Sequence, residues 1–268
     1  MRLVNLAVNV GAIAVCLATT LALQLPQLNQ RLVGQTLESD RKAVKQEEAR
    51  LQVLNRLPPK GFGFNNTIAN FAFISFLQYF GDDEARVDHK TGFSLSPKYF
   101  EVIVDRNPRF LNIYIYLSTS VSMFAAEPRK AIALYSKGLE SLSPEQEPYA
   151  YTVWRRKATD ELLFLGDAEA ARKSYLNAAE WADRAKFGAD APLETKYVAQ
   201  WSRESAAWLS EKRDLRSAQI SAWKLVLSTA IDKKTLQNIA IEVDKLGMQL
   251  TVKEDGKIDI IPKKAPNS

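Results

Sequence analysis

The sequence is poor in the residues that build most catalytic and metal centres. It contains one cysteine and one histidine among 268 residues. A single cysteine excludes an intrachain disulfide framework and a zinc site made of several thiolates, and a single histidine leaves little room for a histidine-rich metal site. Eleven glycines and eleven prolines are too few for a collagen-like or low-complexity chain. We therefore expect a globular protein that is not an enzyme and carries neither a cofactor nor a metal ion.

Charge is also missing from the amino-terminal end, where residues 3–25 are uncharged and mostly apolar. At 1.5 Å per residue a helix of this length spans roughly 34 Å, enough for a hydrocarbon core of about 30 Å. The segment predicts a membrane anchor over residues 1–26. A cleaved signal peptide and a buried soluble helix are the alternatives. Retention is favoured because the apolar run continues beyond the cleavage site at residues 20–22.

The charges on either side of this segment bear on its orientation. Arg2 precedes it, and Arg31 and Arg41 follow within about fifteen residues, so the balance is nearly even. Short amino-terminal tails usually stay in the cytoplasm. We therefore expect a single-pass membrane protein whose body lies on the non-cytoplasmic side.

Residues 27–60 are interpreted as an amphipathic helical spacer between the anchor and the body. Val44, Leu51 and Leu54 recur at helical spacing, with charged residues between them. The prolines and the glycine of residues 57–61 then interrupt the helix.

Residues 61–247 predict a succession of helices separated by short turns. Apolar residues recur with the helical period, and proline or glycine marks most of the boundaries. The predicted helices cover residues 66–80, 96–105, 109–126, 128–142, 149–165, 168–186, 193–210, 215–230 and 233–246.

A repeated pattern occurs in this region: a small residue, an aromatic four positions later, and a small or apolar residue three positions after that. Three copies follow the pattern and a fourth lacks the aromatic: Ser96-Phe100-Ile103, Ala131-Tyr135-Gly138, Ala171-Tyr175-Ala178 and Ala218-Ala222-Leu225. In these positions the sequence resembles the tetratricopeptide-repeat (TPR) family. The resemblance implies stacked helical hairpins, in which the small residue lets two helices approach and the aromatic fills the space between repeats.

The expected fold class is therefore all-α. We expect a right-handed α-solenoid of about four irregular TPR-like helical hairpins, with an N-terminal transmembrane helix and a small C-terminal β-hairpin. Residues 76–82 and 160–167 are also similar to membrane-anchored bacterial repeat proteins, cyanobacterial ones among them. That likeness implies a bacterial inner (plasma) or thylakoid membrane. It also implies an alternative function as a structural accessory subunit of a photosynthetic or respiratory complex.

The carboxyl end changes from helical to alternating periodicity. Residues 248–262 are predicted to form a β-hairpin that covers the end of the helical stack, and residues 263–268 a disordered tail. A three-residue loop with Gly256 in the left-handed conformation matches apolar residues across the two strands. The expected pairs are Val252 with Ile258 and Leu250 with Ile260.

The residues that could support chemistry are interpreted as structural. His89 lies in a polar loop without a recognisable nucleophile, so we expect an exposed loop histidine. The acidic residues 82–88 do not have the spacing of an EF-hand, which favours a solvated loop. The basic residues 155–157 occupy consecutive helix positions and point in different directions, so no nucleic acid partner is expected.

If the hairpins stack as in the TPR family, their first helices line a concave surface. The residues expected to form this partner-binding groove are Tyr116, Ser120, Arg156, Asp160, Gln200, Arg203 and Glu211. Such a mixed polar set suits an extended peptide or an acidic chain terminus. The expected function is a membrane-anchored scaffold or assembly factor that binds a protein or peptide partner, with the oligomeric state left open.

The alternative from a different class is a carrier of a small ligand or lipid. It would use the aromatic residues between positions 71 and 100, namely Phe71, Phe76, Tyr79, Phe93 and Phe100. A pocket open at its mouth would favour a carrier, whereas a closed aromatic core would exclude it.

Overall fold

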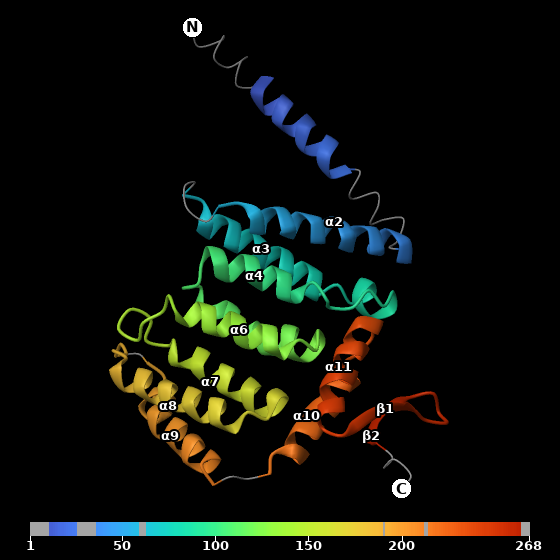
Figure 1. Ribbon diagram of the computed structural model, residues 1–268. Helices are drawn as coiled ribbons and strands as arrows, with labels where there is room; N and C mark the ends of the chain where they lie inside the picture. Colours follow the sequence, from blue (N-terminus) through green and yellow to red (C-terminus); the bar gives the residue numbers. More distant parts are fainter. Residues whose placement is uncertain (1–10, 26–35, 59–62, 190, 212–213, 264–268) are drawn as a thin grey trace.

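The computed structural model describes residues 11–25, 36–58, 63–189, 191–211 and 214–263. These residues are mostly helical, with a two-stranded antiparallel sheet near the carboxyl end (Figure 1). Residues 11–25 form an exposed helix. Within the described ranges no helix is long and apolar enough to cross a membrane. Residues 1–10 of the predicted anchor and residues 264–268 of the predicted tail lie outside these ranges, so both stay predictions.

The predicted helices are all present, with ends that differ by a few residues. The segments at 109–126 and 149–165 are composite, because each ends in a π-helical turn. The elements of the body are α2 (Leu37–Arg56), α3 (Asn65–Phe80), η1 (Glu84–Asp88), α4 (Ser96–Arg106), η2 (Leu111–Ile113), α5 (Tyr114–Leu117), η3 (Ser118–Phe124), α6 (Pro128–Leu139), α7 (Tyr151–Asp160), η4 (Glu161–Leu165), α8 (Ala168–Arg184), η5 (Leu193–Lys196), α9 (Val198–Leu209), α10 (Arg216–Ser228), α11 (Lys233–Lys245), β1 (Met248–Val252) and β2 (Ile258–Pro262).

Local sequence explains several of the helix starts. The side chains of Thr36, Asp167 and Asp232 accept hydrogen bonds from the first backbone N–H groups of α2, α8 and α11, which otherwise have no partner within the helix. Proline lies in the first turn of α4 and α6, where its missing N–H costs nothing.

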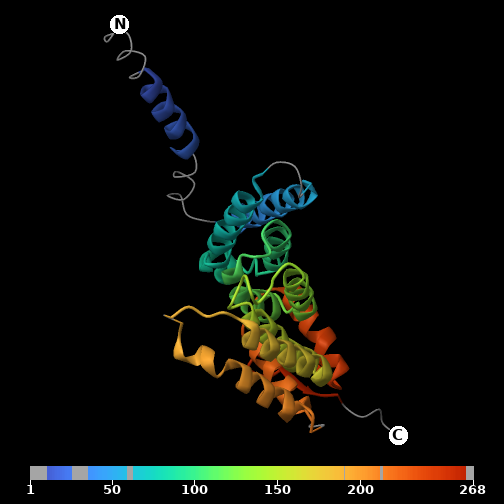
Figure 2. The same ribbon diagram turned by 90° about the vertical axis from the view of Figure 1, so that its left-hand side faces the viewer.

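Successive helices from α3 to α9 pack against one another as a stack (Figures 1 and 2). The small residues of the three complete repeat copies, Ser96, Ala131 and Ala171, are fully buried between neighbouring helices. Gly138 shows how close the approach is, because a Cβ atom there would lie 1.9 Å from the hydroxyl of Tyr114. The small-residue pattern therefore marks real helix–helix contacts in these three copies.

The fourth copy of the pattern does not mark a buried contact between helices, so the expectation of a fourth hairpin at this position was wrong. Ala218 and Leu225 are exposed, and α10 instead packs through Trp223 and Val226 against η4, α11 and β2. The helix α10 therefore does not form the hairpin with α9 that a fourth repeat implies, and it packs at the ends of the earlier hairpins (Figure 1). Its aromatic position is Ala222, which is too small to fill the space between repeats.

Helices α10 and α11 run across the ends of the hairpins and cap the π-helical turns (Figure 1). The indole N–H of Trp223 donates to the carbonyl of Phe164 (3.3 Å), and the side-chain amide of Asn238 donates to the carbonyl of Ala125 (3.1 Å). Terminal carbonyls of a helix have no partner within the helix. These two donors therefore hold the last helices against the stack.

The predicted β-hairpin is confirmed, including its register. Val252 pairs with Ile258 and Leu250 with Ile260, and Gly256 has a φ of +79°. The hairpin packs on the last two helices of the body: Ile260 is buried against α10 and α11, while Val252 at the tip is exposed.

Residues 36–58, the described part of the segment predicted as a spacer, pack on the body through α2. Leu51 of α2 is fully buried in the same core as α3 and α4, and Glu47 accepts a hydrogen bond from the hydroxyl of Tyr99 (2.8 Å). The buried guanidinium of Arg106 on α4 donates to the carbonyls of Leu54 (2.7 Å) and Pro58 (3.1 Å) at the end of α2. Amphipathicity alone did not show that the apolar side of α2 has a partner in the same chain.

The aromatic residues between positions 71 and 100 form a closed core. Phe76 and Phe100 are fully buried with ring centroids 4.7 Å apart, and Tyr79 and Phe93 are also buried. Of the five aromatics assigned to a carrier pocket, Phe71 is the one that is exposed. Tyr79 also lines an open hollow of about 210 Å³ beside α2, but the other lining residues are mainly polar or charged. The five aromatics together therefore do not form the open pocket that would favour a carrier.

Candidate functional site

An open groove of about 350 Å³ lies between α7 and α9, which both pack on α8. The helix α7 is the first helix of its hairpin, and α9 occupies the corresponding place beyond α8. The residues that line the groove are Tyr151, Thr152, Arg155, Arg156, Thr159, Glu194, Val198 and Trp201.

The α7 wall of the groove is cationic. Arg155 and Arg156 are half-buried there, and neither guanidinium forms a hydrogen bond or ion pair with another described residue. Burial raises the pKa of the Tyr151 hydroxyl, and the positive charge of Arg155 offsets part of this rise. Glu194 is the one acid among the lining residues. The groove therefore carries a net positive charge and suits a carboxylate ligand.

The α9 wall is aromatic. Trp201 stacks on Tyr197 with ring centroids 5.9 Å apart, and both side chains are exposed. Trp208 lies two turns further along α9 and is exposed as well. Because α10 packs elsewhere, it leaves this face of α9 open. Tryptophan, tyrosine and arginine are the residues that most often carry the binding energy of protein interfaces.

Of the residues predicted to face the groove, Arg156 is among its lining residues. Ser120 and Asp160 are buried at 1% and 0% exposure, so the expectation that they face a partner was wrong. Ser120 lies within the π-helical turn η3, which adds one residue and shifts the following side chains to a different face. Asp160 is the last residue of α7 and is buried because η3 covers it, with Ser118 and Ser122 donating to its carboxylate.

The other predicted residues lie outside the groove lining. Tyr116 is half-buried and packs against Phe73 and Phe76. Gln200 and Arg203 are exposed on α9, where Gln200 donates to Glu204 (2.8 Å) and Arg203 pairs with Asp183 of α8. Glu211 is exposed just beyond α9. Whether these four residues contact a partner stays a prediction.

Asp160 instead joins two hairpins from within. Its carboxylate accepts hydrogen bonds from the hydroxyls of Ser118 and Ser122, each at 2.5 Å. Burial raises the pKa of this carboxyl to about 6, although the two serines and the nearby Arg156 act in the opposite direction. The carboxyl is completely enclosed by the described protein, and its two hydrogen bonds hold η3 against α7.

The residue that follows, Glu161, makes a second buried connection. It pairs with Lys157 of the same helical segment (2.5 Å) and accepts a hydrogen bond from Ser174 of α8 (2.6 Å). The ammonium of Lys157 also lies 5.5 Å from the ring centroid of Trp154. A charge pair with satisfied hydrogen bonds fixes the geometry of α7 on α8, and with it the floor of the groove.

His89 is not the exposed loop residue that we expected. It is half-buried, and its Nδ1 lies 2.5 Å from Oδ2 of the buried Asp40 on α2. This contact attaches the acidic loop to α2, a partner 49 positions away that no local pattern reveals. Among the described residues there is no group of three or more metal-ligating side chains.

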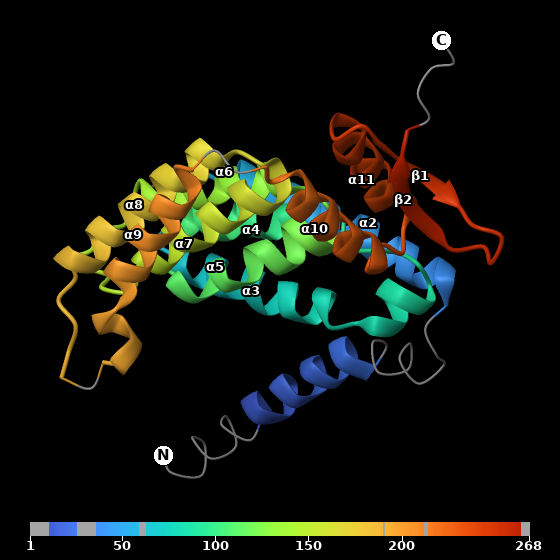
Figure 3. The same ribbon diagram turned by 90° about the horizontal axis from the view of Figure 1, so that it is seen from below.

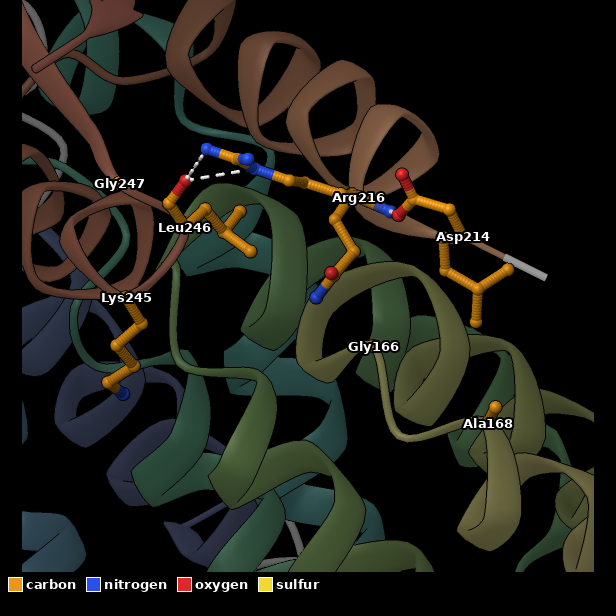
Figure 4. Close-up of a pocket in the computed structure, with 9 residues that line it drawn as sticks. Gly166, Ala168, Asp214, Arg216, Lys245, Leu246 and Gly247 are labelled. Atoms are coloured by element: carbon orange, nitrogen blue, oxygen red, sulfur yellow. Dashed lines mark hydrogen bonds between the residues drawn. The ribbon is translucent and has the colours of Figure 1, made fainter. Parts of the chain in front are cut away.

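A larger cavity of about 550 Å³ lies where α10 and α11 meet the turn between η4 and α8 (Figure 4). The guanidinium of Arg216 is directed at the carbonyl of Leu246 and donates to it from Nη2 (2.7 Å) and Nε (3.2 Å). Gly166, at a φ of +64°, lies against Gln219. Arg216, the arginine that lines this cavity, is thus already used to join α10 to α11. The smaller α7–α9 groove is therefore the better candidate for a ligand.

Comparison of the chain with family models, curated proteins and solved structures found no match. The TPR resemblance therefore stays a prediction that rests on the repeat residues themselves.

Proposed function

We propose that this protein is a non-enzymatic interaction scaffold, held at a membrane by residues 3–25, that binds an acidic segment of a partner protein in the α7–α9 groove. The observation that carries the proposal is that one groove combines an exposed tryptophan, Trp201, with two arginines. Neither Arg155 nor Arg156 has an ion partner among the described residues. A guanidinium binds a carboxylate through two parallel hydrogen bonds, and an aromatic beside it anchors an apolar side chain.

The arrangement of the hairpins supports a short, TPR-like α-solenoid. Three buried small-residue contacts recur along the stack, and the groove lies between helices that would line its concave side. In this proposal the solenoid has three hairpins and one unpaired helix, α9. The unpaired helix leaves the aromatic face of the groove uncovered.

The enclosure of one buried carboxyl is compatible with a binding role. Asp160, whose pKa is raised to about 6, is completely enclosed by the described protein. The carrier alternative is less well supported, since four of its five aromatics are buried in the core and the open hollow at Tyr79 is lined mainly by polar residues. An accessory role in a larger membrane complex is compatible with the same groove and stays a prediction.

The test measures binding of a fluorescein-labelled peptide of alternating glutamate and phenylalanine by anisotropy. The variants Arg155→Glu and Trp201→Ala should each weaken binding by about tenfold or more, equivalent to about 1.4 kcal/mol. The first loses a charge-assisted hydrogen bond and the second an apolar anchor. Higher salt should weaken binding to the parent chain, because the groove attracts the peptide through exposed charge.

The matched control is Arg172→Glu. It makes the same charge reversal on α8, outside the groove lining, at a surface pair with Glu169. Equal losses in Arg155→Glu and Arg172→Glu would mean that net charge alone drives binding and would refute the groove. A crosslinking pull-down from native membranes with the parent and the Arg155→Glu chain then identifies the partner that depends on this wall.

A further inference from the structure

Two neighbouring helical segments of the body carry no charge at all. No charged residue occurs between Lys60 and Asp82, which includes α3, or between Arg109 and Glu127, which includes α5 and η3. The two segments pack side by side, since the ring centroid of Phe73 lies 5.3 Å from that of Phe110 and 5.5 Å from that of Tyr116. Figure 3 shows α3 and α5 along one side of the body.

The outer side of these segments is apolar. Phe71, Ile74 and Leu77 of α3 are 51%, 54% and 41% exposed, and Ile115 of α5 is 50% exposed. The exposed polar residues between them are uncharged: Asn70, Gln78, Asn112 and Thr119. We call these exposed residues the α3–α5 face. Large apolar side chains gathered on an uncharged surface mark a site of contact with another phase or molecule.

We propose that the α3–α5 face lies against the headgroup region of the membrane that residues 3–25 enter. This inference rests on the membrane attachment proposed above. Residues 26–36 separate Leu25 from α2, and at roughly 3.5 Å per residue this stretch reaches at most about 40 Å. The start of the body is therefore kept close to the membrane. The helix α3 packs beside α2, where Arg50 donates to Ser75 (2.6 Å).

The chemistry of the face fits lipid better than a second protein. It offers no charged group that would select a protein partner by ion pairing. A surface of phenylalanine, leucine, isoleucine and uncharged polar residues partitions into the boundary between headgroups and acyl chains. At its edge, the guanidinium of Arg50 lies 4.7 Å from the ring centroid of Phe71. The same guanidinium pairs with Glu47 (2.8 Å) and donates to Ser75 (2.6 Å), so it borders the face without adding an unpaired charge to it.

The experiment places a spin label on the face of the full chain in phosphatidylcholine vesicles. The native cysteine is removed by Cys16→Ser, and single cysteines are introduced by Ile74→Cys, Leu77→Cys or Asn70→Cys. The control is Glu169→Cys, at an exposed position on α8. Power saturation then compares how often each nitroxide collides with oxygen, which concentrates in lipid, and with a water-soluble nickel chelate. Melting curves followed by circular dichroism show that each labelled chain is folded, and three positions keep one misfolded variant from deciding the result.

Labels on the face should collide severalfold more with oxygen, relative to nickel, than the label at position 169. Equal nickel access at positions 74 and 169 would place the face in water and overturn the inference while leaving the attachment intact. Immobilised labels shielded from both reagents would show that a protein surface covers the face, and would overturn it too. A chain that fails to float with the vesicles would overturn both this inference and the proposed attachment.

Discussion

The buried carboxyl of Asp160 should make the stability of this protein depend on pH in a defined direction. The residue has no exposed surface, and its two oxygens accept hydrogen bonds from Ser118 and Ser122. Burial raises its pKa from an ordinary 3.8 to about 6. The folded protein therefore holds this proton more tightly than the unfolded chain does. The stability that this site contributes is complete below about pH 4 and is lost as the pH rises to about 6.

The magnitude follows from the difference between these two pKa values. Each pH unit over which the folded state alone is protonated corresponds to about 1.4 kcal/mol, so the site loses roughly 3 kcal/mol between pH 4 and pH 7. The variant Asp160→Asn has nearly the same shape but no charge. One serine can donate to its amide oxygen and the other can accept from its amide N–H₂. We expect its stability to be similar to the parent near pH 4 and higher by about 1–3 kcal/mol near pH 7.5.

The assay is urea unfolding followed by circular dichroism at a series of pH values. It uses the chain without residues 1–26, because the helix at residues 11–25 is exposed along its whole length. The control is Asp88→Asn, which removes an exposed carboxylate. Subtracting the control isolates the contribution of the buried site from the general charge of the protein.

Two results would refute the reasoning. A difference between Asp160→Asn and the parent that is constant over the whole pH range would show that the carboxyl does not titrate with a raised pKa in the folded state. A variant that is strongly destabilised at every pH would show that the two serines require an acceptor-only carboxylate. In that case the hydrogen bonds, and not the cost of the buried charge, dominate at this site.

Three further predictions concern the architecture. Deleting residues 1–26 should leave a soluble helical protein with an unchanged melting temperature, since residues 11–25 are exposed; aggregation of that fragment would show that the segment packs on the body. Gly138→Ala should destabilise the fold by about 1–3 kcal/mol through overpacking against Tyr114, whereas Gly188→Ala, with nothing within 4 Å of its Cβ, should be neutral or slightly stabilising in the same urea titration. Trp223→Phe should cost about 1–3 kcal/mol, because it leaves the buried carbonyl of Phe164 without its donor. Trp201→Phe on the surface should change stability by less than about 0.5 kcal/mol, and equal losses in the two tryptophan variants would contradict the capping role of α10.

Local patterns were sufficient wherever a residue's role depends on its near neighbours in the chain. The order of the helices follows from the helical period of the apolar residues and from the prolines and glycines between them. The register of β1 with β2 follows from matching apolar residues on either side of the loop that contains Gly256. The three complete small-residue patterns marked buried contacts for the same reason, since each belongs to one hairpin and its neighbour.

The residues of the α7–α9 groove were harder to predict, because the prediction assumed that the regular helical period continues through each helix. Counting along ideal helices selected Arg156, which lines the α7–α9 groove, but also put the buried Ser120 and Asp160 on the surface. The π-helical turn η3, which contains Ser120, shifts that count, and Asn238 of α11 donates to the carbonyl of Ala125 just beyond it from far along the chain. Asp160 is buried because Ser118 and Ser122 of η3 donate to its carboxylate. A signal that could have found the groove is the cluster of Tyr197, Trp201 and Trp208 on one side of α9.

The uncharged amino-terminal segment, the helical body, the paired strands and the scarcity of cysteine and histidine are all properties of the sequence by itself. They depend on composition and on spacings of a few residues. Only the tertiary structure decided that α2 belongs to the body, that His89 meets Asp40, and that α10 leaves α9 to cross the hairpin ends. Each of these outcomes joins residues far apart in the chain, so it is selected by the burial and hydrogen bonding of the whole molecule and not by any local pattern.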